Sequence, residues 1–259
     1  KRVLRSRLLV QQKPRLGFYN SYNPDVIGDH IQQSLRGNIQ FWASSWWGPE
    51  SKTNVILKDH ILTHPNAGKL KYAILYESMG RIKAADPEKP FDELNYENVL
   101  SDFLYLKKHY FDNPNYLKID GKSVVYVYLG REYFRGQGHD VLAKVRSEIP
   151  DVYIVSDDVF GERYKSNWAK PFDAITAYDV YGQSTKKYGG TKKAVSALAS
   201  QYKNAKKKAN SVGVAFMPTI APGYNDRAVR DGNEGRSRKF SDNPTSNEGD
   251  FFRAMIDNV

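Results

Sequence analysis

The sequence contains no cysteine among its 259 residues. This absence excludes disulfide bonds, thiolate nucleophiles and zinc sites built from cysteine. No apolar run approaches the length of about 18 residues that a membrane-spanning helix needs, so no transmembrane helix is predicted. The sequence also has no glycine-rich turn after a first strand, no Gly-x-Ser-x-Gly elbow and no P-loop. It therefore carries no fingerprint of a dinucleotide-binding fold, an α/β-hydrolase or a P-loop nucleotide-binding protein.

Acidic residues are fewer than basic ones, with 29 Asp and Glu against 39 Lys and Arg and a net charge of +10. The basic excess is clustered in residues 1–15, 186–208 and 227–239. Such a balance favours anionic partners, for example nucleic acid, phospholipid or acidic glycan. A solvated basic surface is the simpler interpretation, because the basic residues are not interleaved with aromatic ones. We therefore expect at most weak contact with polyanions, and nucleic acid is not favoured as a partner.

Short β-rich runs alternate along the chain with amphipathic helical patterns of 10–18 residues. One such helix is predicted to begin at Asn23 and Pro24 and to end at Gly37. Strands that alternate with helices of this length predict βαβ units and a parallel sheet. Six strands are predicted, over residues 39–43, 72–76, 124–129, 152–155, 174–177 and 214–220.

The residues best suited to chemistry come directly after these strands. They are Trp46, Trp47, Glu77, Arg131, Asp157, Asp158, Tyr178, Asp179, Tyr224 and Asp226. The active site of a (β/α)8 barrel is built from such carboxyl ends of strands, whereas a doubly wound sheet binds ligands only near its switch point. We therefore expect the α/β class and a (β/α)8 TIM-type barrel, formed as a single domain over residues 1–259. A complete barrel needs eight strands, two more than the pattern provides.

The most unusual segment is Ser45-Trp46-Trp47-Gly48, which follows a predicted strand. Two adjacent tryptophans would be costly to expose without a purpose. Their flat faces could stack on sugar rings while their polar edges hydrogen-bond to hydroxyl groups. The alternative is that one or both plug the top of the barrel core. Tyr126 and Tyr128 share one face of their strand, from which they would either stack inside the barrel or pack against helices.

Glu77 follows a strand and is expected at the barrel mouth. There its carboxylate could accept hydrogen bonds from hydroxyls or take part in acid–base chemistry, and a structural ion pair is an equally open alternative. Asp157 and Asp158 are adjacent, so at most one of them can face the site. His60 and His64 have a spacing that metal ligands can use, but no carboxylate motif accompanies them. We expect no metal and no other cofactor, and spacing alone nominates no pair of carboxylates for glycoside hydrolysis.

Several short segments occur in a distinctive order. They are Leu16-Gly17-Phe18-Tyr19-Asn20-Ser21, Val26-Ile27 with His30-Ile31, Ser44-Ser45-Trp46-Trp47-Gly48-Pro49, Tyr76-Glu77, Gly121-Lys122 with Tyr126-Val127-Tyr128, Phe172-Asp173 with Tyr178, and Pro222-Gly223-Tyr224. Through these segments the chain resembles glycoside hydrolase family 99 and its relatives, the endo-α-mannosidase group. The Ser-Trp-Trp-Gly segment is the most specific of them.

The resemblance implies a (β/α)8 barrel that hydrolyses internal α-mannosidic linkages with retention, in α-mannan or mannosyl oligosaccharides, without a metal. An oligosaccharide or polysaccharide is then the expected partner. A secreted, periplasmic or secretory-pathway location is favoured by the resemblance alone. Glu77 matches a substrate-binding carboxylate of the barrel mouth. The full set of expected substrate-binding residues is Trp46, Trp47, Glu77, Tyr126, Tyr128, Tyr178, Asp179 and Tyr224.

The sequence departs from the family pattern in one important respect. The family's catalytic pair lies in a late motif of the type Asn-Glu-Trp-His-Glu, and residues 1–259 contain no such motif. The catalytic residues therefore stay unknown, and the pair is expected beyond Val259, which could leave this chain alone inactive. The first and last strands of the barrel are expected to be the two that are absent. The alternative is a non-catalytic barrel, a pseudoenzyme that binds glycans or has a structural role.

Overall fold

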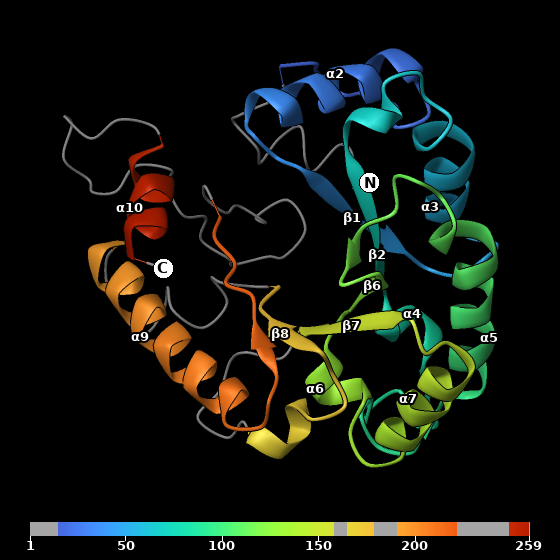
Figure 1. Ribbon diagram of the computed structural model, residues 1–259, viewed down its shortest axis with the longest axis vertical. Coiled ribbons are helices and arrows are strands. Elements are labelled where there is room, and N and C mark those ends of the chain that lie inside the picture. Colours follow the sequence, from blue (N-terminus) through green and yellow to red (C-terminus); the bar gives the residue numbers. More distant parts are fainter. Residues whose placement is uncertain (1–14, 158–164, 179–190, 222–248, 259) are drawn as a thin grey trace.

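Within the described part of the chain, six parallel strands form the centre of the molecule (Figure 1). The structure is a computed structural model that describes residues 15–157, 165–178, 191–221 and 249–258. The strands pair in the order in which they are named here: β1 (Phe41–Trp46), β2 (Lys71–Tyr76), β6 (Lys122–Val127), β7 (Val152–Asp157), β8 (Ala174–Thr176) and β9 (Ala215–Phe216). All six lie where the sequence predicts them, although β9 is shorter than the run 214–220. The predicted parallel sheet is therefore confirmed.

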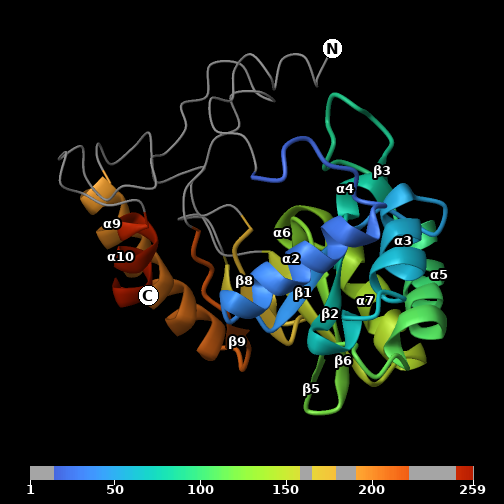
Figure 2. The same ribbon diagram turned by 90° about the horizontal axis from the view of Figure 1, so that it is seen from above.

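Helices follow the strands and surround the sheet on its outer side (Figures 1 and 2). The larger ones are α2 (Pro24–Arg36), α5 (Glu97–Leu106), α7 (Gln137–Glu148), α9 (Thr191–Asn210) and α10 (Asp250–Asn258). Shorter pieces are α3 (Lys52–Val55) with its π-helical continuation η1 (Ile56–Ile61), η2 (Ala67–Lys69), α4 (Ser78–Arg81), η3 (Lys107–Phe111), α6 (Gly130–Tyr133) and η4 (Ser166–Ala169). Within the described residues, no helix is both long enough and apolar enough to cross a membrane.

The helix that the sequence predicts between Asn23 and Gly37 is confirmed as α2. The Asn23 side chain accepts a hydrogen bond from the backbone amide of Asp25, and Pro24 occupies the first helical position. The amide of Gly37 closes the last turn by donating to the carbonyl of Gln33. These are the caps expected from the chemistry of asparagine, proline and glycine at helix ends.

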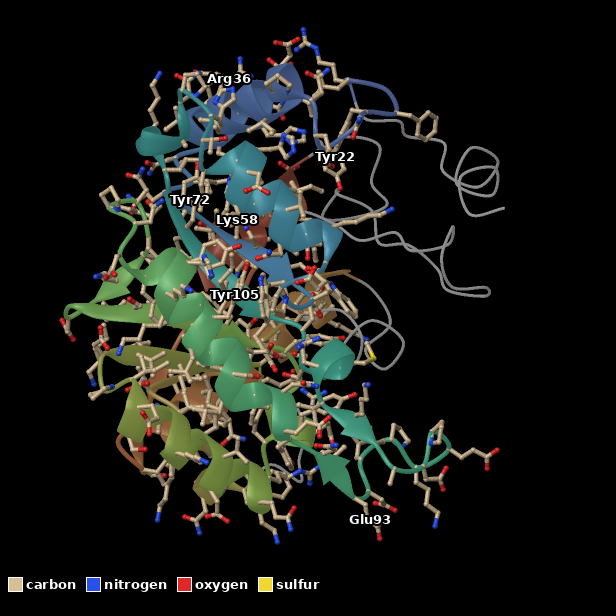
Figure 3. The ribbon with its side chains drawn as sticks, turned by 90° about the vertical axis from the view of Figure 1, so that its right-hand side faces the viewer. Tyr22, Arg36, Lys58, Tyr72, Glu93 and Tyr105 are labelled. Atoms are coloured by element: carbon tan, nitrogen blue, oxygen red, sulfur yellow. The ribbon has the colours of Figure 1, made fainter. Side chains whose placement is uncertain are left out.

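The connection after β2 carries secondary structure of its own. It forms α4 and then a separate two-stranded antiparallel sheet of β3 (Lys83–Ala84) and β4 (Leu94–Asn95). Figure 3 shows this sheet projecting from the body of the molecule, with Glu93 near its far end. The other addition to the predicted elements is β5 (Lys118–Ile119), which pairs antiparallel with β6.

The sheet separates two apolar layers. On the outer side, Tyr76, Val125 and Ile154 pack with side chains from α5 and α7 such as Phe103 and Leu142. On the inner side lies a smaller cluster in which Ala73, Val124, Val155 and Ala174 pack with Tyr126, Tyr153 and Met217. Residues of one strand alternate between the two layers, as the pleat of a β-strand requires.

Among the described residues the barrel does not close. β1 and β9 are the two ends of the strand order, and no pairing between them is present in that part of the chain. The parallel strands therefore form an open arc with helices outside and a concave inner face. The carboxyl ends of all six strands lie at the same end of this arc, because parallel strands run in one direction.

A buried charge pair fixes α4 to the outer layer. The Arg81 guanidinium donates to both carboxylate oxygens of Asp102 on α5, from Nε at 2.7 Å and from Nη2 at 2.8 Å. The Tyr76 hydroxyl donates to the same carboxylate at 2.9 Å. Burial and the neighbouring Asp102 raise the pKa of Tyr76 well above its ordinary value, so its hydroxyl stays protonated as a donor.

We predict that Asp102→Ala lowers the free energy of unfolding by about 3–5 kcal/mol, because it leaves the Arg81 guanidinium without its buried partner. Urea denaturation monitored by circular dichroism measures this loss. The matched control is Asp59→Ala, which removes the exposed 3.9 Å pair between Lys58 and Asp59 and should change stability by less than about 1 kcal/mol. Equal losses in the two variants would contradict the prediction.

Candidate functional site

Polar and aromatic side chains gather on the inner face, at the carboxyl ends of the strands. Alternation along β1 and β2 puts Ser45 and Glu77 on this face, opposite to Trp46 and Tyr76, which pack in the outer layer. The ladder continues one residue past β2 and β6, since Glu77 N–H donates to the Trp46 carbonyl and Tyr128 N–H to the Tyr76 carbonyl. Adjacent strands therefore bring these side chains together although they are far apart in the sequence.

A row of hydrogen bonds connects three side chains of this face. The Trp47 indole Nε1–H donates to the Ser45 hydroxyl oxygen at 2.9 Å, and the Ser45 hydroxyl donates to Glu77 Oε1 at 2.6 Å. Glu77 is 8% exposed, whereas Trp47 is 42% exposed. The row thus runs from an indole at the surface to a carboxylate that is largely removed from water.

Burial raises the pKa of Glu77 above its ordinary value, and the hydrogen bond from Ser45 partly offsets this rise. Desolvation disfavours the charged form, whereas a donor aimed at the carboxylate favours it. The sequence left open an ion pair between Glu77 and a basic neighbour, but no such pair is present among the described residues. Glu77 is therefore a desolvated carboxylate held by a hydroxyl group.

The expectation that Trp46 contacts a ligand is wrong. Its side chain is 0% exposed and lies on the outer side of the sheet, stacked against Tyr76. Its Nε1–H donates to Asn54 Oδ1 at 2.8 Å, and the Asn54 amide in turn donates to the Pro49 carbonyl. Because neighbours on a strand face opposite ways, Trp46 serves the core and Trp47 the inner face.

Trp47 is held against the backbone of α4. A Cβ atom built on Gly80 would lie 2.4 Å from Trp47 Cε3 and 2.8 Å from Cζ3, so the indole occupies space that only glycine leaves open. Gly48, the next residue, has φ +110°, and a Cβ there would lie 2.6 Å from Arg81 Nη1. The turn after β1 therefore depends on both glycines, which fit it closely against α4.

A second part of the inner face is built from Tyr128 and Tyr178. Their ring centroids are 4.9 Å apart with an interplanar angle of 70°, an edge-to-face arrangement. Asp157, which is 6% exposed, joins their backbones: Oδ1 accepts from Tyr178 N–H at 2.9 Å and Oδ2 from Leu129 N–H at 3.3 Å. Leu129 adopts the left-handed region at φ +51°, an uncommon conformation for a branched side chain.

Tyr126 also faces inward but does not reach the rim. Its ring stacks with Phe41 at 6.3 Å, and its hydroxyl lies 3.9 Å from the Met217 sulfur. Burial raises the pKa of its phenol. Tyr126 therefore fills the interior below Tyr128, which is the stacked arrangement that the sequence analysis gave as one of its two alternatives.

Among the described residues, the remaining candidates add nothing to these two groups. Asp179 and Tyr224, together with Asp158 and Asp226, lie outside the described residues. Arg131 lies in α6 and pairs with Glu132 at 3.4 Å. Of the candidate set, the structure thus brings Trp47 and Glu77 together in one row and Tyr128 and Tyr178 together in one pair.

The two histidines with a spacing suited to metal ligands do not meet at a metal site. The His60 ring packs edge-on against Tyr22, and His64 Nδ1 accepts a hydrogen bond from the Asn66 amide. In the part of the chain that the structure describes, no cluster of His, Asp or Glu could hold a metal ion.

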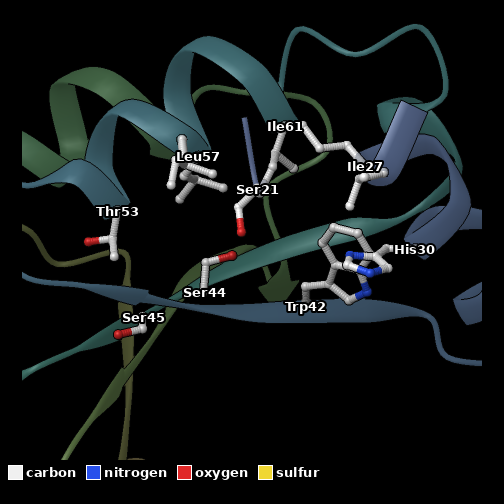
Figure 4. A pocket seen from close by; sticks show the side chains of 11 residues that line it. Ser21, Ile27, His30, Trp42, Ser44, Ser45, Thr53, Leu57 and Ile61 are labelled. Carbon is white, nitrogen blue, oxygen red and sulfur yellow. The ribbon is translucent and has the colours of Figure 1, made fainter. Parts of the chain in front are cut away.

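A separate cavity of about 270 Å³ lies on the other side of β1, between that strand, α2 and η1 (Figure 4). Apolar side chains such as Ile27, Leu57 and Ile61 line it, together with His30 and Trp42. Figure 4 shows the Ser44 hydroxyl turned toward this cavity and Ser45 at its margin. Neighbouring serines therefore serve opposite sides of the strand.

An arc of parallel strands, with helices outside and a carboxylate and aromatic rings at the carboxyl ends within, is the architecture of an α/β barrel protein with its site in the barrel mouth. The chain belongs to glycosyl hydrolase family 99, whose family model matches residues 7–256. This confirms the resemblance drawn from the short segments of the sequence.

Individual relatives support the fold. The mouse glycoprotein endo-alpha-1,2-mannosidase is 23% identical over 238 residues, which cover 87% of this chain and 47% of that protein. The GH99 endo-alpha-mannosidase from Bacteroides thetaiotaomicron superposes with a TM-score of 0.63 at 19% identity, over 95% of this chain and 67% of that one. A glycoside hydrolase-like protein gives a TM-score of 0.70 at 19% identity, with 95% and 74% covered. The chain spans about half the length of the curated relative.

We predict that Glu77→Gln makes the protein more stable at about pH 7 than the wild type. The folded state raises the pKa of Glu77, so the wild type loses stability as pH rises through the window above the ordinary glutamate pKa. Glutamine carries no charge at any pH, and its carbonyl can still accept from Ser45. The gain should shrink toward zero at about pH 3.5, where the carboxyl is protonated in both states.

Urea denaturation at both pH values measures this difference. The exposed Glu88→Gln serves as control and should follow the wild-type pH dependence. Identical pH slopes for wild type and Glu77→Gln would show that burial does not disfavour the Glu77 carboxylate.

We further predict that Gly80→Ala displaces the Trp47 indole, because the new methyl group would overlap its ring. The NMR cross-peak of the Trp47 indole N–H should shift as its bond to Ser45 is lost, with little change in stability since the ring is partly exposed. Gly68→Ala is the control, because its Cβ would meet nothing closer than 3.8 Å. An unmoved cross-peak in Gly80→Ala would contradict this packing.

Proposed function

We propose that this barrel is a carbohydrate-active protein of the endo-α-mannosidase type, which binds α-mannosyl oligosaccharides or α-mannan in its mouth. The observation that carries the proposal is the row from Trp47 through Ser45 to Glu77. An exposed indole face can stack on a sugar ring, while a carboxylate beside it accepts hydrogen bonds from the hydroxyl groups of the same ring. Family membership and the endo-α-mannosidase relatives support α-linked mannose as the sugar of this proposal.

The inner face offers more than one place for a sugar. Trp47 and Glu77 belong to the ends of β1 and β2, whereas Tyr128 and Tyr178 follow β6 and β8. Tyr178 is 58% exposed, so its ring is accessible from solvent. Aromatic side chains at two separate places on one concave face suit a chain of sugars better than a single monosaccharide.

Hydrolysis with retention belongs to the same proposal. It requires two carboxyl groups, one as nucleophile and one as general acid. Asp157 is a poor candidate for either, because both of its oxygens already accept hydrogen bonds from backbone amides. Glu77 is suited to ligand binding, so both catalytic carboxyl groups are proposed to come from outside the described residues. A glycan-binding barrel without catalysis is the alternative.

The test is calorimetric titration of the protein with α-1,2-mannobiose. Glu77→Gln keeps the shape of the side chain but weakens the bonds to sugar hydroxyls, so affinity should fall by roughly one to two orders of magnitude. Trp47→Ala should weaken binding by roughly tenfold or more through lost stacking. Glu88→Gln, on the exposed loop between β3 and β4, should bind as the wild type does.

Product analysis on longer α-mannosyl oligosaccharides separates the two alternatives. Release of shorter oligosaccharides supports the hydrolase, and binding without turnover supports the glycan-binding barrel. Failure to bind any α-mannoside, or unchanged affinity in both site variants, would overturn the proposed site.

A further inference from the structure

The Ser45 hydroxyl acts both as a hydrogen-bond donor and as a hydrogen-bond acceptor. A hydroxyl offers one donor hydrogen and acceptor lone pairs. The donor points at Glu77 Oε1 at 2.6 Å, and a lone pair receives the Trp47 indole N–H at 2.9 Å. The Trp47 N–H needs a lone pair of the Ser45 oxygen, so the hydroxyl hydrogen of Ser45 has to point away from Trp47. The two hydrogen bonds together therefore fix the orientation of the hydroxyl group.

This arrangement constrains two side chains that would otherwise have rotational freedom. Trp47 is partly exposed, and its ring lies against the backbone of Gly80 while its indole N–H donates to Ser45. Glu77 accepts the hydrogen bond of the Ser45 hydroxyl through Oε1. Holding a side chain in one rotamer before a ligand arrives lowers the entropy that binding has to overcome.

Charged groups near Glu77 do not take this role. Arg81, four residues further on, is engaged by Asp102 on the outer side of the sheet. Asp157 on the inner face is bonded to the amides of Leu129 and Tyr178. Within the described residues, the side-chain hydrogen bond recorded for Glu77 is the one from Ser45.

We propose that Ser45 is a positioning residue of the sugar site, which holds the Glu77 carboxylate and the Trp47 indole in one row so that both meet the same sugar ring. The inference rests on the proposed function for its ligand, but the row itself can be tested without any sugar. In this proposal the Ser45 hydroxyl couples the polar contact made by Glu77 to the stacking contact made by Trp47.

The experiment compares three variants by NMR and by titration. Ser45→Ala removes the hydroxyl, Ser45→Thr restores it on a side chain suited to a strand, and Ser44→Ala removes the neighbouring hydroxyl on the other side of β1. The readouts are the pH titration of the isotope-labelled Glu77 carboxyl, assigned with Glu77→Gln, and the Trp47 indole N–H cross-peak. Affinity for α-1,2-mannobiose is measured in parallel.

In Ser45→Ala, the pKa of Glu77 should rise further, because the charged form loses a donor. The Trp47 indole cross-peak should move, and sugar affinity should fall roughly tenfold. Ser45→Thr should restore all three properties, and Ser44→Ala should leave them unchanged. A general loss of folding would not produce this pattern.

Two results would overturn the inference. If Ser45→Ala leaves the Glu77 titration and the Trp47 cross-peak as in the wild type, Ser45 does not position them. If both readouts change while sugar affinity stays the same, the row exists but does not serve the sugar. A wild-type protein that binds no α-mannoside instead refutes the proposed function, and the NMR readouts still decide whether Ser45 holds the row.

Discussion

The period of two along a β-strand is the constraint on which this molecule depends. Each strand of the arc is covered by helices outside and lines a concave face inside, so successive residues enter different environments. Tyr76 joins the outer apolar layer and Glu77 the inner face, although they are neighbours in the chain. A single residue of slip in the register would exchange these two roles and bury the carboxylate among aromatic rings.

The same constraint explains which sequence predictions succeeded. The positions of the strands follow from β-rich runs between helical patterns, and all six strands lie where those runs are. The sequence pattern leaves open whether one or both tryptophans pack in the core, whereas strand alternation assigns Trp46 to the core and Trp47 to the mouth. Applying to this pair the rule that separated Asp157 from Asp158 would have found the difference from sequence alone.

Other features of the site could not be predicted from residue patterns. Ser45 is a common residue in a strand, and its importance comes from the distance at which β2 places Glu77 beside it. Asp157 accepts hydrogen bonds from backbone amides that follow two other strands. No side-chain motif in the sequence indicates such bonds. Gly80 lies 33 positions after Trp47, and only the packing of α4 across the end of β1 brings their atoms into contact. Such contacts depend on tertiary geometry, whereas strand positions depend on local composition.

The shortness of α4 ties the outside of the molecule to its mouth. Within four residues it carries Gly80, on which the Trp47 ring lies, and Arg81, which is fastened to Asp102 on the helical side. A helix of this length extends only about 6 Å. The contact of Gly80 with Trp47 and the ion pair of Arg81 with Asp102 are therefore rigidly connected. A change in the packing of α5 that moves Asp102 would therefore also move α4 and the Trp47 ring at the rim. At this corner of the barrel, substitutions in the outer packing layer can therefore shift the Trp47 ring without changing any residue of the mouth.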